Sequence, residues 1–197
     1  MQTMIFNKQL FLISLLLLLL TGCAAAVIGA GAAVGTTATV AHDRRTTGTF
    51  IEDQAIELKA VKSYFFDKEI NDSSHINVTS YNTVVLITGE TPSEDLRQRI
   101  VNIVKNIQKV THIYDELTIA APSSWTSRGS DTLITAKVKT RLLTLDNFDG
   151  TRVKVVTEKG VVYLMGLLTR AESDIATGEA QQSGGVQKVV KLFQYID

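Results

Sequence analysis

The stretch HINVTSYNTVVLITGETPSE at residues 75–94 recurs as RVKVVTEKGVVYLMGLLTRAE at residues 152–172. Each stretch contains two runs rich in β-branched residues around a short polar turn, which predicts a β-hairpin. The positions that align are Ile76 with Val153, Val78 with Val155, Val84 with Val161, and Gly89 with Gly166. Two copies of one supersecondary unit are the simplest explanation of this repeat.

In the first copy, helical segments flank the hairpin. Thr49 with Glu52, and Thr91 with Glu94, each match a capping box, and Pro92 would take the first helical position of the second helix. A last strand is predicted from His112 to Ile119. The apolar residues at helical spacing are Ile51, Ala55, Leu58, Val61 and Phe65 in the first helix, and Leu96, Ile100, Ile103, Val104 and Ile107 in the second.

The second copy repeats this order. Ser130 is suited to cap its first helix, Thr169 with Glu172 forms another capping box, and residues 189–196 form the last strand. The short match of NIQKV at residue 106 with GVQKV at residue 185 aligns Asn106 with Gly185 as helix stops. Glycines interrupt the second helix of this copy, so we expect that helix to be weaker or kinked.

The predicted fold class is α+β, with two small αββαβ domains whose helices pack on one face of a three-stranded mixed sheet. The domains cover residues 49–120 and 130–197, and the Pro- and Ser-containing stretch at residues 121–129 is a linker by composition. The central strands, VVLI at residue 84 and VVYLM at residue 161, are apolar on both sides. Helices on one face bury only alternate residues, so we expect the rear faces to pack on each other or on a partner.

Residues 1–22 carry one Lys, an apolar run and a small-residue end, which is the layout of a secretory signal peptide. The end of this segment, Leu20-Thr21-Gly22-Cys23, resembles a bacterial lipobox, so Cys23 is the expected lipidation site and the mature N-terminus. Residues 23–48 then form the lipidated N-terminus and tether. Gly29 and Gly31 follow no strand, and their spacing to Gly35 does not match a dinucleotide-binding loop.

Charge is distributed unevenly between the two domains. The chain has 20 basic and 20 acidic residues, so its composition does not indicate nucleic-acid binding. Residues 50–120 have a net charge of −4, whereas residues 128–197 have +2, which suits only the second domain to an anionic surface. In its first helix Ile134, Val138, Leu142 and Leu145 share one stripe, and Leu133 falls outside it, beside Lys137 and Thr140.

Several segments together resemble the dual BON-domain outer-membrane lipoproteins. They are GCAAAVIGAGAAVGT, INVTSYNTVVLITGE, SDTLITAKVKTRLLT, VKVVTEKGVVYLMGLLTRAE and the terminal FQYI, and they cover nearly the whole chain. The resemblance implies a lipid-anchored protein on the periplasmic side of the outer membrane, with roles in envelope integrity and at the division site. It also implies that the second domain binds anionic phospholipid, such as phosphatidylglycerol or cardiolipin.

The resemblance places a membrane-contacting Trp of the family at the position of Leu133, where Leu keeps the apolar insertion but lacks the amphipathic ring. Trp125 has two open interpretations, a nearby aromatic anchor or packing between the domains. The phospholipid-binding residues that we predict are Arg128, Leu133, Lys137, Lys139, Thr140 and Arg141.

Catalysis is not indicated by the sequence. His42, His75 and His112 have no spacing typical of a metal site, and no Gly-x-Ser-x-Gly motif is present. We therefore expect a protein without enzymatic activity, small-molecule substrate or cofactor other than the covalent lipid on Cys23. The alternative is a periplasmic platform that binds envelope proteins and touches the membrane only through Cys23.

Overall fold

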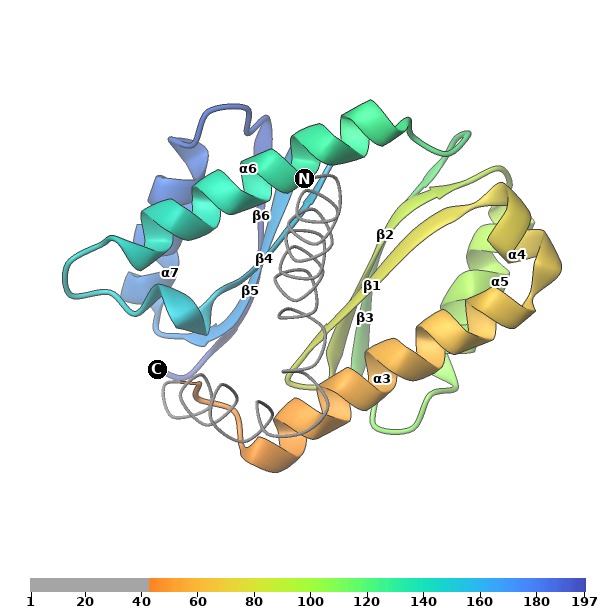
Figure 1. Cartoon of the computed structure of the whole chain (residues 1–197). Coiled ribbons are helices and arrows are strands. Elements are labelled where there is room, and N and C mark those ends of the chain that lie inside the picture. Colours follow the sequence, from red (N-terminus) through yellow and green to blue (C-terminus); the bar gives the residue numbers. More distant parts are fainter. Residues whose placement is uncertain (1–42) are drawn as a thin grey trace, which may run out of the picture. The chain divides into compact units, whose positions relative to one another are not determined.

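The structure is a computed structural model, and it describes residues 43–197. The signal peptide, Cys23 and the first part of the tether lie outside the described residues. The chain forms two three-stranded sheets, in the orders β1-β2-β3 and β4-β5-β6 (Figure 1). In both sheets the first two strands are antiparallel and the last strand is parallel to the central one, which confirms the predicted mixed sheet. The strands are β1 (His75–Tyr81), β2 (Val84–Thr91), β3 (His112–Ile119), β4 (Lys154–Glu158), β5 (Val161–Leu168) and β6 (Lys188–Tyr195).

The helices follow the predicted αββαβ order in each copy. The first sheet has α3 (Thr47–Phe66), α4 (Lys68–Ser73) and α5 (Glu94–Lys105), and the second has α6 (Trp125–Leu143), the short 3-10 helix η3 (Gly150–Arg152) and α7 (Arg170–Gln181). The sequence did not predict α4. Between residues 43 and 197, no helix combines the length and the apolar character that crossing a membrane requires.

Three of the predicted helix starts were wrong, because other hydroxyl residues cap the helices. Thr46 caps α3 through the Thr49 amide, and Ser124 caps α6 through the Ser127 amide, so Ser130 and the second half of the predicted linker lie inside α6. Ser93 caps α5 through the Leu96 amide, and Pro92 precedes the cap. The capping box of Thr169 and Glu172 is confirmed.

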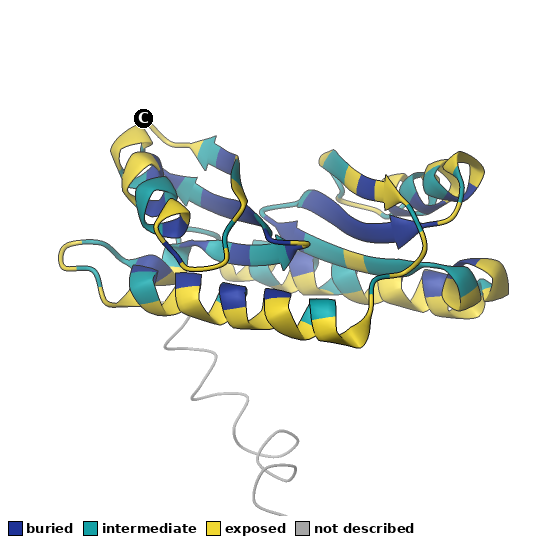
Figure 2. Cartoon of the chain, turned by 90° about the horizontal axis from the view of Figure 1, so that it is seen from above, coloured by how far each residue is buried: buried dark blue, intermediate teal, exposed yellow. Residues whose placement is uncertain are grey.

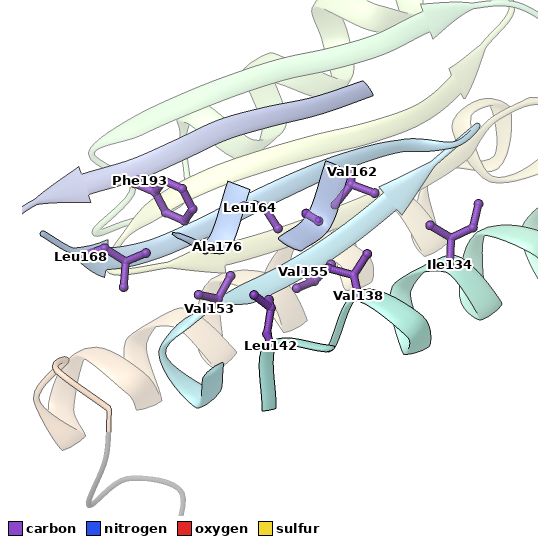
Figure 3. Close-up of a cluster of buried hydrophobic side chains, with 11 residues drawn as sticks. Ile134, Val138, Leu142, Val153, Val155, Val162, Leu164, Leu168, Ala176 and Phe193 are labelled. Atoms are coloured by element: carbon purple, nitrogen blue, oxygen red, sulfur yellow. The ribbon is translucent and has the colours of Figure 1, made fainter. Parts of the chain in front are cut away.

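Each sheet packs one face on its own helices. In the second domain, Ile134, Val138 and Leu142 of α6 point toward the sheet residues of one buried cluster (Figure 3). In the first domain, α3 and α5 pack on Val85 and Ile87 of β2. The stripe predicted for α6 is therefore confirmed for these three residues, whereas Leu145 lies beyond the end of α6 and is only partly buried against the same cluster. By contrast, α3 buries Asp53, Ile56, Ala60 and Tyr64, and leaves the apolar positions used to predict it largely on its outer side.

The rear faces of the two sheets pack on each other. Their shared cluster consists of buried Tyr81 and Leu86 from the first sheet and buried Tyr163, Met165 and Leu192 from the second. In β2, Leu86 belongs to this cluster, while its neighbours Val85 and Ile87 belong to the helix-covered core. Of the two covers predicted for the rear faces, the other domain or a partner, the structure shows the other domain. The alternation agrees with the dark blue central strands in Figure 2.

An aspartate on the first helix of each domain binds the hairpin turn. Asp53 accepts hydrogen bonds from the amides of Asn82 and Thr83, each at 2.8 Å, and from the Ser80 hydroxyl at 2.6 Å. Asp131 likewise accepts from the amides of Lys159 at 2.9 Å and Gly160 at 2.8 Å. The two turn residues have positive φ angles in both hairpins. These carboxylates therefore hold the helix and the strained turn together.

The end of the second helix corrects the sequence alignment. Gly185 has φ +99°, but Asn106 has φ −86°, and the residue of the first copy in the left-handed region at this junction is Lys109, with φ 76°. Both Lys109 and Gly185 lie three residues before their strands begin, so the structural equivalent of Gly185 is Lys109. Gly178 does not interrupt the second helix, because α7 runs as one element from Arg170 to Gln181, and the expectation that this helix is weaker stays a prediction.

Two consecutive arginines before α3 bind both domains. Arg44 makes a two-pronged ion pair with Glu172 of α7, at 2.6 and 2.8 Å. Arg45 binds Asp53 at 2.7 Å, and its guanidinium lies 4.0 Å from the centre of the Tyr81 ring. The hydrogen bond from Arg44 lowers the pKa of Glu172 to about 2. The entrance to α3 is thus fixed to each domain by one charged pair.

Substitution of Asp53 by Ala should lower the free energy of unfolding by about 3 kcal/mol or more, since Arg45 and two turn amides lose their buried acceptor. Urea unfolding of residues 24–197 measures this change. Glu52→Ala is the matched control, because that partly exposed carboxylate has only a 3.5 Å ion pair with Lys109 and should contribute less than about 0.5 kcal/mol. Equal effects of the two substitutions would contradict the role given to Asp53.

Candidate membrane-binding surface

Leu133 is an exposed apolar side chain on α6. The opposite side of this helix, with Ile134, Val138 and Leu142, is buried on the second sheet (Figure 3). Leu133 is consequently turned away from the core, and 64% of it is exposed. The sequence-based prediction of a solvent-facing Leu at this position is confirmed.

Four of the predicted lipid-binding residues lie together. Leu133, Lys137, Thr140 and Arg141 line one surface groove of about 460 Å³, whose other wall is formed by Ser183 and Gly184 after α7. The ammonium group of Lys137 lies 3.4 Å from the carbonyl oxygen of Gly184, to which it donates. About two turns of α6 and the loop after α7 therefore form this groove, called here the α6 groove.

The cations of the α6 groove differ in how far they are neutralised. Arg141 donates to Glu179 at 2.6 and 3.1 Å and to Gln182 at 3.2 Å. Within residues 43–197, no acidic side chain pairs with the exposed ammonium group of Lys137. Lys137 is thus the group best suited to attract an anion to the groove.

Arg128 and Lys139 do not line the α6 groove. Arg128 lies 4.2 Å from the centre of the Trp125 ring and donates to the Ser123 carbonyl at 3.0 Å. Lys139 is exposed elsewhere on α6. Trp125 itself is 83% exposed, so of its two interpretations the structure does not favour packing between the domains.

A second groove, of about 480 Å³, runs between β1 and β4. It is lined by the polar residues His75, Asn77, Arg128 and Asp131 and also by Trp125 and Val155. A Cβ at Gly89 would lie 1.9 Å from the His75 carbonyl oxygen, so Gly89 is what lets this part of β1 approach β2.

His75 and Glu158 of this groove belong to a cluster that no sequence spacing indicated. His75 and Glu90 from the first domain and Glu158 from the second have potential ligand atoms within 4.8 Å of one another. Such a set could in principle hold a metal ion. However, Lys159 pairs with Glu90 at 2.9 Å, and Arg128 lies 3.3 Å from His75 Nδ1. Because these two cations already balance the carboxylates, we treat the cluster as a polar contact between the domains.

The two carboxyl groups of the cluster differ in acidity. Burial raises the pKa of Glu158, and the negative charge of Glu90 raises it further. Burial opposes ionisation of Glu90 as well, but hydrogen bonds from Lys159 and the Ser123 amide outweigh it and lower the pKa. Asn77 donates to Glu158 at 3.2 Å across the domain contact. Glu158 is therefore the group whose ionisation costs the folded state free energy.

Glu158→Gln should raise the free energy of unfolding at pH 7.5 by about 1 kcal/mol, since the neutral amide keeps an acceptor for Asn77 without a buried charge. A raised pKa stabilises the folded state at low pH, and this stability is lost as pH rises through the folded pKa. The gain should therefore shrink toward pH 4. Urea unfolding at both pH values measures it, and a variant less stable than the native protein at pH 7.5 would contradict this assignment.

The fold and these surfaces define a protein made of two copies of one small α+β unit. Most of its large exposed apolar side chains lie on α3 and α6. The BON domain family matches residues 53–121 and 130–197. The chain belongs to this family, as its sequence segments suggested.

Curated relatives match most of the chain. It is 36% identical to "Outer membrane lipoprotein DolP" of Haemophilus influenzae, with 90% of this chain and 91% of that protein covered. It is 32% identical to "21 kDa hemolysin" of Actinobacillus pleuropneumoniae, over 78% of this chain and 79% of the relative. It is also 32% identical to "Osmotically-inducible protein Y" of Escherichia coli (strain K12), over 72% of each.

Proposed function

We propose that this protein is a non-enzymatic outer-membrane lipoprotein whose second BON domain binds anionic phospholipid from the periplasmic side. The observation that carries the proposal is Leu133, which is 64% exposed beside the ammonium group of Lys137, a cation with no acidic partner among residues 43–197. An apolar side chain next to cations suits the boundary between headgroups and acyl chains. Thr140 and Arg141 complete the wall on which a headgroup would rest.

The membrane anchor in this proposal is a lipid on Cys23. Its support is the sequence Leu20-Thr21-Gly22-Cys23 after an apolar segment. The Haemophilus relative, which is named an outer membrane lipoprotein, matches 90% of the chain. A protein held at the outer membrane in this way would support the integrity of the envelope, and the division site is the location we propose for this role.

The α6 groove alone would bind a bilayer weakly, so the proposal needs the anchor and the groove together. One basic residue near an anionic surface contributes about 1 kcal/mol, and one inserted Leu about 1.5–3 kcal/mol. The summed binding free energy of Leu133, Lys137 and one further cation corresponds to a dissociation constant of roughly 1 mM. The covalent lipid would then supply retention, and the groove would sense the composition of the bilayer.

The alternative function is a platform that binds envelope proteins. Its main support was that the two rear sheet faces need a cover. Tyr81, Leu86, Tyr163, Met165 and Leu192 are buried against one another, so no external partner is required there. Lipid binding therefore remains the better-supported function.

Flotation of residues 24–197 with vesicles tests the proposal. We expect recovery with vesicles containing phosphatidylglycerol or cardiolipin, little with phosphatidylcholine alone, and weaker binding at high salt. Leu133→Glu should reduce recovery about tenfold or more, because it removes the inserted side chain and adds repulsion. Ile175→Glu on α7 is the matched control, since Ile175 is 46% exposed and lies outside the α6 groove. Equal losses in both variants would contradict a site at Leu133.

A further inference from the structure

The outer side of α3 is an exposed apolar stripe. Five large side chains on this helix are between 56% and 73% exposed: Ile51, Leu58, Val61, Phe65 and Phe66. Ile51, Leu58 and Phe65 recur every seven residues, so they lie in one row along the helix. This set is called the α3 stripe. Exposed apolar residues are common singly, but a row of this length on one helix indicates a contact surface.

The orientation of α3 is fixed by its other side. Ile56, Ala60 and Tyr64 are buried in the core of the first domain, and buried Asp53 holds the hairpin turn. Rotation that hid the α3 stripe would expose these groups and leave Asp53 without its donors. The stripe therefore stays on the surface of the folded chain.

Cations accompany the α3 stripe, and most acids of the helix point elsewhere. Lys59 and Lys62 are exposed, and Lys62 lies about 20° from Ile51 on a helical wheel, within the stripe itself. Asp53 is buried, and Glu57 pairs with Lys154 of the second domain at 2.7 Å. The first domain has a net charge of −4, yet this one face is apolar and cationic. The expectation that only the second domain suits an anionic surface overlooked this face.

We propose that α3 is a second membrane contact, lying along an anionic bilayer with the α3 stripe in the headgroup boundary. The proposal rests on the proposed function only in taking the same bilayer as the partner. Lysines within an apolar row suit a bilayer, because their stems lie along the acyl region while the ammonium groups reach phosphates. A pairing of two copies through this stripe would bury the Lys62 ammonium group in an apolar contact, whereas a bilayer leaves that group among the phosphates, so the bilayer is the favoured occupant.

The placement of α3 agrees with this role. Within residues 43–197, α3 and α6 lie along the same side of the two sheets, at the lower edge of Figure 2 and toward the viewer in Figure 1. The ion pair between Glu57 of α3 and Lys154 of β4 joins the domains on this side. Thr47, the first residue of α3, follows Cys23 by 24 residues, a chain that spans at most about 80 Å. A lipid on Cys23 would therefore keep α3 within reach of the bilayer.

Site-specific fluorescence separates this inference from the proposed function. Residues 24–197 lack Cys23, the single cysteine of the chain, so one introduced Cys can carry an environment-sensitive dye. The variants are Leu58→Cys on α3, Leu133→Cys on α6 and, as a control, Ile175→Cys on α7. With vesicles of phosphatidylglycerol and phosphatidylcholine, we expect a blue shift at positions 58 and 133 that brominated lipid quenches, and no change at 175.

The outcomes are distinct. A response at 133 with none at 58 would overturn the α3 contact and leave the proposed function intact. A response at 58 with none at 133 would support the α3 contact and overturn the proposed site on α6. A shift at 58 that grows with protein concentration in the absence of vesicles would identify a second copy as the occupant and overturn the proposal.

A double variant adds a quantitative check. Leu58→Ser with Phe65→Ser should reduce partitioning onto anionic vesicles at least about tenfold while leaving the unfolding midpoint unchanged, because both side chains are exposed. Ile175→Ser is the matched control and should bind like the native protein. Unchanged partitioning of the double variant would contradict the proposal.

Discussion

Tyr163, Met165 and Leu192 of the second sheet pack with Tyr81 and Leu86 of the first, and this contact removes both rear sheet faces from water. Burial of one such side chain stabilises a protein by about 1.5–3 kcal/mol, so five contribute on the order of 10 kcal/mol. That sum is comparable with the whole free energy of unfolding of a small domain. Each domain, with about 70 residues, buries ten or eleven residues in a cluster of its own, which is a marginal core for a domain that folds alone. The shared cluster therefore makes the two repeats into one structural unit.

The contact between the sheets also decides which surfaces remain for function. Because the rear faces are used, the large apolar side chains that stay exposed among residues 43–197 lie mainly on the outer sides of the helices. The exposed apolar residues of α3 and α6 lie on these outer sides, and Arg44 and Arg45 fix the chain that enters α3. Stability and the proposed membrane contacts thus depend on different faces of the same helices.

The sequence predicted those features that depend on local periodicity. The hairpins, the order of helices and strands along the chain and the α6 stripe of Ile134, Val138 and Leu142 follow from spacing and the repeat. The buried side of α3 could not be predicted, because its two sides both carry apolar residues at helical spacing and only tertiary packing chooses between them. The sequence also could not predict that Glu90 lies close to Glu158, since this depends on how the two sheets pack.

Hydrogen exchange of residues 24–197 carrying Met165→Ala tests most directly whether the two repeats are one cooperative unit. Met165 belongs to the second sheet, but it packs in the shared cluster. The account predicts that this cavity lowers the free energy of opening of amides in both β5 and β2 by similar amounts, about 2–5 kcal/mol. Faster exchange confined to β5, with β2 protected as in the native protein, would contradict the account.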